Sequence, residues 1–303
     1  MQLTLRDIRK TYPNGVKALD GVSLTIPVGM YGLLGPNGAG KSSLMRILAT
    51  LQEADSGSAM LGDIDVLRQK DEVRRTLGYL PQEFGVYPHA SAGALLDHFA
   101  ILKGIAARGE RRDMVESLLR QVNLWDVRTQ KLGGYSGGMR QRFGVAVALL
   151  GNPKLLIVDE PTAGLDPAER ARFLNLLSEL GETSAVILST HIVEDVSELC
   201  TRMAIIRQGR ILLEAEPLQA VAGIRGRIWR RVIAKDELPA IQRDHAVIAT
   251  TLLGGRTVVR VHDTASPGPG FETAEPDLTD VYFSTMAGHI GLHRADSQPV
   301  PSA

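Results

Sequence analysis

A glycine-rich segment near the N-terminus carries the residues best suited to chemistry on a phosphate. The run Gly35-Pro36-Asn37-Gly38-Ala39-Gly40-Lys41-Ser42 fits G-x-x-x-x-G-K-[ST] and links an apolar stretch, Met30–Leu34, to helical sequence at Ser42–Thr50. Glycines let backbone N–H groups curl around a phosphate, and the N-terminus of the next helix adds partial positive charge. Lys41 would supply a point charge to the β- and γ-phosphates, and the Ser42 hydroxyl would ligate Mg²⁺. The segment therefore predicts a site for ATP, formed by Gly35, Pro36, Asn37, Gly38, Ala39, Gly40, Lys41, Ser42 and Ser43.

Two acidic residues follow a stretch that is apolar at every position. Leu155–Val158 predicts a buried strand, and Asp159 and Glu160 come directly after it. In a protein with a phosphate loop, an aspartate at this point helps to hold Mg²⁺, and the next carboxylate can polarise the water that attacks the γ-phosphate. In isolation such a pair would more often cap a helix. Together with the phosphate loop, the pair indicates hydrolysis of a nucleoside triphosphate.

A third segment, Tyr135-Ser136-Gly137-Gly138-Met139, comes shortly before that strand and opens a predicted helix, Met139–Leu150. It resembles the signature motif of the ABC (ATP-binding cassette) ATPases, and the resemblance extends over about residues 1–215. The commonest form of that motif has Leu and Gln where this chain has Tyr135 and Met139, and the Tyr…Met version is similar to that of exporters of drugs, antibiotics and polysaccharides. The resemblance implies a head-to-tail dimer, with itself or with a homologous cassette. Each ATP would lie between one subunit's phosphate loop and Ser136, Gly137 and Gly138 of the other.

Further positions match the family's motifs one by one. Gln82 resembles the Q-loop glutamine that reaches Mg²⁺ and the attacking water, and Asp166 resembles the D-loop aspartate at the dimer interface. His191, after the apolar run Ala185–Leu188, resembles the switch histidine that contacts the γ-phosphate. Tyr12 resembles the aromatic that stacks on adenine, although an aromatic near a strand end is as often a core residue. The resemblance thus implies catalytic roles for Glu160, His191 and Gln82, and it implies Mg²⁺ ligation by Ser42, Gln82 and Asp159.

These residues need a sheet and helices to position them. The continuous apolar runs predict a parallel sheet covered by helices on both faces, and the alternation in Leu3–Arg9 and Ala18–Pro27 predicts half-buried strands. We therefore predict an α/β fold. Its parts are a P-loop NTPase core with a mainly parallel sheet, an N-terminal antiparallel β subdomain, a helical insertion over about residues 84–149 and a small C-terminal α+β appendage.

The sequence changes in character after Pro217. Ile228–Ala234, Ala246–Leu253 and Thr257–Val261 predict a small antiparallel sheet, and Asp277–Met286 predicts a helix with an acidic start. We expect an ATP-binding domain at 1–215, a C-terminal α+β domain at 216–287 and a disordered tail at 288–303. The basic run Arg225–Arg231 favours a solvated strand edge over contact with lipid head groups.

Composition narrows the choice of partners. Lys plus Arg equals Asp plus Glu at 34 each, so no bulk charge points to nucleic acid. The single cysteine, Cys200, excludes an intrachain disulfide framework and suits a reducing compartment. No stretch approaches the ~18 consecutive apolar residues of a membrane helix. If the protein serves a membrane, we expect another chain to span it.

The resemblance also names that partner. Glu275–Phe283 is similar to the C-terminal helix of ABC-2-type exporter ATPases, which implies an ABC-2-type transmembrane permease subunit as partner and a peripheral location on the cytoplasmic face of the cell membrane. In this family the partner docks after the Q-loop, here Glu83–Ala100, where Phe84, Val86 and Tyr87 would form an apolar groove. An importer subunit and a soluble ABC ATPase without a transport role remain alternatives.

Overall fold

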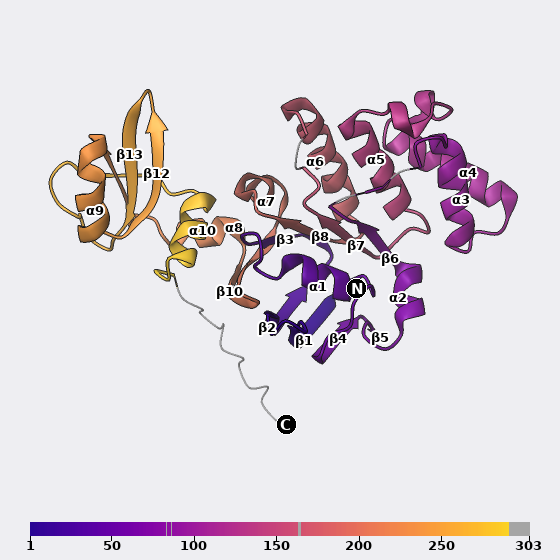
Figure 1. Cartoon of the computed structure of the whole chain (residues 1–303), viewed down its shortest axis with the longest axis horizontal. Coiled ribbons are helices and arrows are strands. Elements are labelled where there is room, and N and C mark those ends of the chain that lie inside the picture. The colour runs from indigo at the N-terminus through magenta and orange to yellow at the C-terminus, as the bar shows by residue number, and fades with distance from the viewer. Residues whose placement is uncertain (83, 86, 163–164, 291–303) are drawn as a thin grey trace.

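A six-stranded sheet forms the centre of the fold (Figure 1). The computed structural model describes residues 1–82, 84–85, 87–162 and 165–290. The strand order is β10-β9-β3-β8-β7-β6, and every neighbouring pair is parallel except β10 with β9. The strands are β3 (Gly29–Leu34), β6 (Leu77–Leu80), β7 (Leu155–Asp159), β8 (Ala185–Thr190), β9 (Arg202–Arg207) and β10 (Arg210–Ala215). β7 and β8 are buried at every position, which confirms the strands predicted from their apolar runs.

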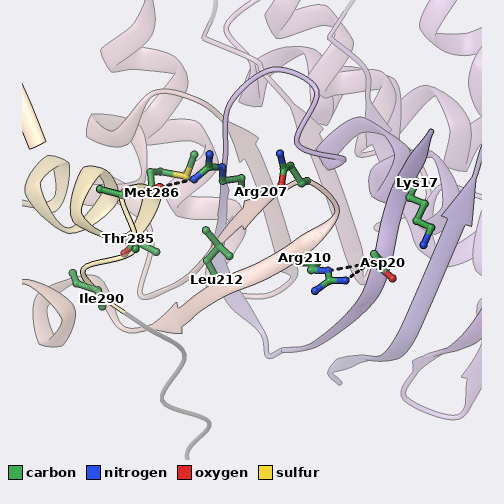
Figure 2. A pocket seen from close by; sticks show the side chains of 11 residues that line it. Lys17, Asp20, Arg207, Arg210, Leu212, Thr285, Met286 and Ile290 are labelled. Carbon is green, nitrogen blue, oxygen red and sulfur yellow. Dashed lines mark hydrogen bonds and ion pairs between the residues drawn. The ribbon is translucent and has the colours of Figure 1, made fainter. Parts of the chain in front are cut away.

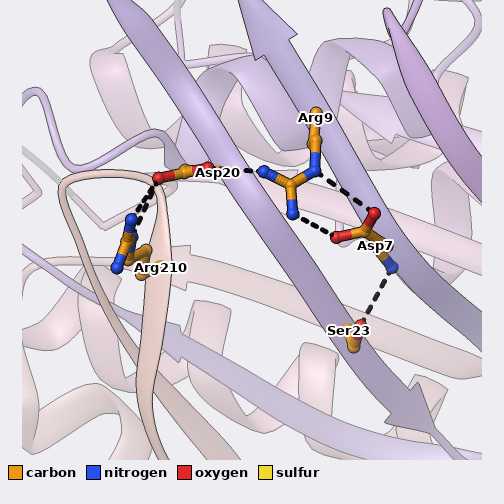
Figure 3. A network of polar contacts seen from close by, with 5 residues as sticks. All are labelled: Asp7, Arg9, Asp20, Ser23 and Arg210. Carbon is orange, nitrogen blue, oxygen red and sulfur yellow. Dashed lines mark hydrogen bonds and ion pairs between the residues drawn. The ribbon is translucent and has the colours of Figure 1, made fainter.

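A second, antiparallel sheet of four strands lies beside it, in the order β2-β1-β4-β5. Its strands are β1 (Leu3–Thr11), β2 (Lys17–Ile26), β4 (Ser56–Leu61) and β5 (Ile64–Asp65). A polar network joins this sheet to the central one (Figure 3). Asp20 on β2 pairs with Arg9 of β1 at 2.7 Å and with Arg210 of β10 at 2.6 Å. Asp20 therefore links the N-terminal sheet to the β9–β10 hairpin, in addition to the ion pair that it forms within its own sheet.

Helices cover both faces of the central sheet and build a lobe beside it (Figure 1). Those outside the lobe are α1 (Lys41–Leu48), α2 (Lys70–Thr76), α6 (Pro167–Gly181) and α7 (Val193–Leu199). The lobe contains α3 (Ala92–Leu102), α4 (Arg108–Gln121), α5 (Gly137–Ala148) and two short 3-10 helices, Trp125–Val127 and Leu132–Gly134. Leu96, Leu119 and Phe143 are fully buried in one cluster between its helices.

The predicted docking segment lies beside the lobe. Phe84 is partly buried and packs on Phe143 of α5, with ring centroids 6.1 Å apart, so its place in a docking groove stays a prediction. The Tyr87 side chain is 65% exposed, as a docking residue requires. Val86 lies outside the described residues.

A small α+β unit follows the central sheet in the sequence and lies at the left of Figure 1. It contains α8 (Pro217–Ala222), β11 (Ile228–Ile233), a 3-10 helix (Lys235–Glu237), α9 (Leu238–Asp244), β12 (Val247–Leu253), β13 (Arg256–His262), β14 (Glu272–Thr273) and α10 (Leu278–Met286). The sheet order is β12-β13-β11-β14, so β11 is an inner strand. The prediction that the basic run forms a strand edge is wrong, because Trp229 pairs with Thr273 of β14.

The link between this unit and the cassette uses α10. The Arg260 guanidinium binds the buried Asp280 carboxylate at the start of α10, and Arg207 at the end of β9 donates to the Met286 carbonyl at 2.5 Å. The division of the chain at 215 and 216 stays a prediction, and the predicted tail lies outside the described residues from 291 onward. Within the described part of the chain, every helix is too short or too polar to cross a membrane.

Candidate functional site

The phosphate loop runs from the end of β3 to the start of α1, and its shape depends on glycine. Gly40 has φ +109°, and a Cβ there would overlap the Ala18 carbonyl oxygen. A Cβ on Gly35 would lie 2.5 Å from the Ile206 oxygen. Larger residues therefore cannot keep this backbone path, which explains the glycine spacing in the sequence.

Lys41 is held under this loop. Its side chain is 4% exposed, and its Nζ donates to the Gly35 carbonyl at 2.7 Å and to the Pro36 carbonyl at 3.3 Å. Burial lowers the pKa of Lys41, and the nearby charges of Glu160 and Asp159 oppose that shift. A buried ammonium of this kind is stabilised by any further anion that enters the site.

The loop borders a cavity of about 410 Å³, a size suited to a small-molecule ligand. At one side of the cavity, the Tyr12 hydroxyl lies 3.0 Å from Ser43 Oγ and donates to Gln52 Oε1 at 3.1 Å. The hydrogen bond with Ser43 is the main reason why the pKa of Tyr12 is lowered. The cavity is lined by Tyr12, Val16, Ala18, Pro36, Asn37, Gly38, Ala39, Gly40, Lys41, Ser42, Ser43, Gln82 and Glu160.

The Glu160 carboxylate is the meeting point of three polar side chains. Its Oε1 lies 3.5 Å from Lys41 Nζ. Its Oε2 accepts a hydrogen bond from Gln82 Nε2 at 3.3 Å and lies 3.3 Å from His191 Nδ1. Glu160 has φ +48°, a strained conformation for a residue with a side chain, and its N–H donates to the Ser189 carbonyl at the end of β8. The fold thus gathers three side chains that are far apart in the sequence around one carboxylate.

Asp159 ends β7 beside Ser189 of β8 and is 3% exposed. Among the described residues, its Oδ1 has no hydrogen-bond partner, and neither has Ser189 Oγ. A buried carboxylate oxygen without a partner is costly unless a ligand satisfies it. A hydrated Mg²⁺ would do so, with the Ser42 hydroxyl on the cavity wall as a further oxygen ligand. The residues present therefore fit this metal.

The predicted signature residues lie apart from the cavity of their own chain, because neither they nor Asp166 line it. Ser136 caps α5 by accepting from the Met139 N–H at 3.1 Å, a role for which serine is well suited. Its hydroxyl also donates to Glu169 Oε1 at 3.3 Å. Asp166 caps α6 by accepting from the Glu169 N–H at 2.8 Å. Ala163 and Gly164, next to Asp166, lie outside the described residues.

Sequence reasoning missed a buried polar pair directly behind the site. Thr162 Oγ1 donates to Asp195 Oδ2 at 2.5 Å, and the two residues are 4% and 0% exposed. The sequence could have indicated this pair, because Thr162 lies two residues after Glu160 and Asp195 lies four residues after His191.

A larger cavity of about 730 Å³ lies between the β9–β10 turn and the end of α10 (Figure 2). Its two arginines are already engaged, Arg210 by Asp20 and Arg207 by the Met286 carbonyl. The turn itself contacts the phosphate loop, since the Gly209 N–H donates to the Ala39 carbonyl at 2.8 Å. Lys41 and Glu160 line the smaller cavity, and neither of them lines the larger one.

Comparison with known proteins agrees with this geometry. Residues 19–163 match the family model described as ABC transporter. The chain is 39% identical over 278 residues to the uncharacterized ABC transporter ATP-binding protein YxlF of Bacillus subtilis, covering 84% of this chain and 89% of that protein. It is 38% identical over 204 residues to the daunorubicin/doxorubicin resistance ATP-binding protein DrrA of Streptomyces peucetius, covering 66% of this chain and 61% of that protein. Two plant relatives are far longer, and the chain spans 23% of their length.

Among solved structures, the chain resembles the ATP-binding cassette MJ0796, determined as a dimer in a post-hydrolysis state bound to ADP and Pi. The TM-score is 0.64 and the identity 27%, with 71% of this chain and 98% of that one covered. The predicted fold class is confirmed by this likeness and by the sheets described above.

Proposed function

This chain belongs to the ABC transporter family and carries its ATP-hydrolysing cassette, and on that premise we propose that it powers an exporter. The observation that carries the hydrolytic part of the proposal is the Glu160 carboxylate, held beside a phosphate loop and within 3.5 Å of Lys41, Gln82 and His191 side chains. A carboxylate in such a place can orient and deprotonate a water in line with a γ-phosphate.

Each polar group then has a task in hydrolysis. The loop amides and Lys41 hold the β- and γ-phosphates, Glu160 takes the proton of the attacking water, and His191 steadies the γ-phosphate. Gln82 donates a hydrogen bond to Glu160 Oε2, the oxygen that also lies near His191. Gln82 is therefore suited to orienting the attacking water. Tyr12 lines the cavity and offers its ring to adenine.

Mg²⁺ is the cofactor that we propose for this site, with Ser42, Gln82 and Asp159 as the residues that hold it directly or through water. The metal would neutralise charge on the phosphate oxygens. The buried Asp159 Oδ1, which has no hydrogen-bond partner within the described part of the chain, supports this assignment. Asp159 is fixed by the β7–β8 pairing, so it can hold a metal shell in place without moving.

We further propose a head-to-tail dimer, with itself or a homologous cassette, in which Ser136, Gly137 and Gly138 of one subunit contact the ATP held by the other. The N-terminus of α5 offers backbone N–H groups and the hydroxyl of its capping residue Ser136, which favour an anion. Asp166 would lie at the same interface. The dimeric form of the cassette MJ0796 supports this arrangement by analogy.

The transport role extends to the partner. DrrA is a daunorubicin/doxorubicin resistance protein, and this relative supports export through a separate ABC-2-type permease, with the cassette at the cytoplasmic face of the cell membrane. Residues 1–215 would form the ATP-binding domain and 216–287 a separate C-terminal domain. Co-expression with a candidate ABC-2-type permease tests the partner: the two chains should copurify, and a transported compound should raise ATP turnover. Stable copurification with an importer permease instead would overturn the export assignment.

The dimer has its own test, because Cys200 is the one cysteine of the sequence and is buried. A mixture of an Asn37→Cys chain and a Ser136→Cys chain should form a disulfide only when MgATP is present. A pair in which Glu110→Cys replaces Ser136→Cys serves as the control and should form no disulfide with or without MgATP. Equal cross-linking with and without nucleotide, or none at all, would refute the head-to-tail arrangement.

A further inference from the structure

We propose that Asp195 is a positioning residue that fixes Glu160 and His191 relative to each other during ATP hydrolysis. The inference rests on the proposed role of Glu160 and adds a residue that does not line the cavity at the phosphate loop. Asp195 lies in the first turn of α7, and its side chain is completely buried.

The Asp195 carboxylate joins three segments of the chain. Its Oδ2 accepts from Thr162 Oγ1 at 2.5 Å, and its Oδ1 accepts from Arg170 Nε at 2.8 Å. Thr162 belongs to the segment that follows Glu160, and Arg170 lies on α6. One buried charge is thereby satisfied from two sides, as a charge in the interior must be.

These contacts bear on the site because of where the three segments lead. Thr162 is two residues after Glu160, and Asp195 is four residues after His191. Glu160 and His191 side chains lie 3.3 Å apart. The Thr162–Asp195 hydrogen bond therefore joins the segment that follows Glu160 to the segment that follows His191, and both segments are only a few residues long. A shift of α7 would move His191 and the backbone after Glu160 together or break the bond.

The strained backbone at Glu160 gives this bond its importance. With φ +48°, Glu160 keeps its direction only if the surrounding contacts hold it. On the N-terminal side, Glu160 is held by the pairing of β7 with β8 and by the hydrogen bond from its N–H to the Ser189 carbonyl. On the C-terminal side, the hydrogen bond from the buried Thr162 hydroxyl to Asp195 holds the backbone that follows Glu160.

The test compares two variants that remove or weaken the bond with two matched controls. Thr162→Val keeps the shape and removes the hydroxyl, while Asp195→Asn removes the charge. Thr162→Ser keeps the donor. Glu198→Gln removes the other carboxylate near Arg170, which is 56% exposed and 3.7 Å away. For each purified full-length protein, kcat and KM for MgATP hydrolysis, the MgATP Kd and the thermal midpoint are measured, all kinetics at a temperature where the variant is folded.

We expect Thr162→Val and Asp195→Asn to lower kcat by about 10- to 100-fold, since small misplacements of catalytic groups cost about that much. The MgATP Kd should change by less than about twofold, because the phosphate loop is untouched. Thr162→Ser and Glu198→Gln should keep the wild-type kcat. This split between kcat and Kd would not arise from a purely structural role, which would lower the thermal midpoint and leave the kcat of the folded protein unchanged.

Several outcomes would overturn the inference. A folded Thr162→Val protein with the wild-type kcat would do so while leaving the proposed function intact, and this variant settles the question if Asp195→Asn fails to fold. A loss of MgATP binding as large as the loss of kcat would point to general distortion and also reject the positioning role. If the wild-type protein does not hydrolyse MgATP at all, the proposed function fails and this inference fails with it.

Discussion

Replacement of Glu160 by Gln removes the charge from the proposed base and keeps its size. The carboxylate is 9% exposed and lies 3.5 Å from Lys41 Nζ. A general base contributes about 10²- to 10⁴-fold to a rate, or about 3–5 kcal/mol of the barrier, so kcat should fall by that factor.

The same substitution should not weaken nucleotide binding. At an effective dielectric constant of about 20, the attraction between Lys41 and Glu160 at 3.5 Å is worth about 5 kcal/mol before desolvation is counted. Without that partner, the buried Lys41 ammonium depends more on an added anion. Glu160→Gln should therefore bind MgATP at least as tightly as the wild type and accumulate as an ATP-bound dimer.

The assay combines steady-state phosphate release with nucleotide titration and size-exclusion chromatography in MgATP. Glu53→Gln is a suitable control, because Glu53 pairs with Lys70 at 2.7 Å but is 79% exposed, and an exposed pair of this kind contributes little. It should leave kcat and Kd unchanged. Hydrolysis by Glu160→Gln within about twofold of wild type would refute the assignment of the base.

Three further changes test other parts of the structure. Gly40→Ala places a Cβ on the Ala18 oxygen at φ +109°, which costs about 1–3 kcal/mol, so MgATP affinity measured by titration should fall at least about fivefold; unchanged affinity would contradict the loop geometry. Glu169→Gln removes a carboxylate that accepts from Ser136 Oγ at the start of α5, and the ATP concentration for half-maximal hydrolysis should drop about two- to fivefold, because about 0.3–1 kcal/mol of competing charge is gone; a rise would refute this competition. Burial is the main cause that lowers the pKa of His262, helped by His289 and Arg227, so the unfolded state takes up protons first and the protein should lose stability as pH falls below about 6.5. In thermal melts His262→Gln should show a weaker dependence on pH over that range, and an identical dependence would exclude His262 as its source.

Features that depend on a few adjacent residues were predictable from the sequence. The glycine spacing at Gly35–Gly40 identified the loop because its backbone angles and close approaches exclude larger side chains. The apolar runs at β7 and β8 identified buried strands because parallel strands are covered on both faces. The short strands β4 and β6 were not predicted, since Ser56-Gly57-Ser58 suggests a turn and four residues at Leu77–Leu80 are too few to show a period.

Pairing between distant segments explains most of the remaining differences. β11 became an inner strand because the two residues of β14 pair with it, and no local pattern announces so short a strand. Phe84 is partly buried because Phe143 of α5 packs against it. In both cases a neighbour far along the chain decided which surface is exposed.

The sequence by itself determined the chemical groups of this protein: a phosphate loop, a carboxylate pair after a buried strand, and a serine that caps a helix. Only the tertiary structure decided that Gln82 bonds to Glu160 across 78 residues and that Thr162 bonds to Asp195 across 33. Residue type and local spacing set what a side chain can do, because those properties are carried by a few bonds of the chain. The order of strands in the sheet sets which side chains meet, and that order results from the packing of the whole domain.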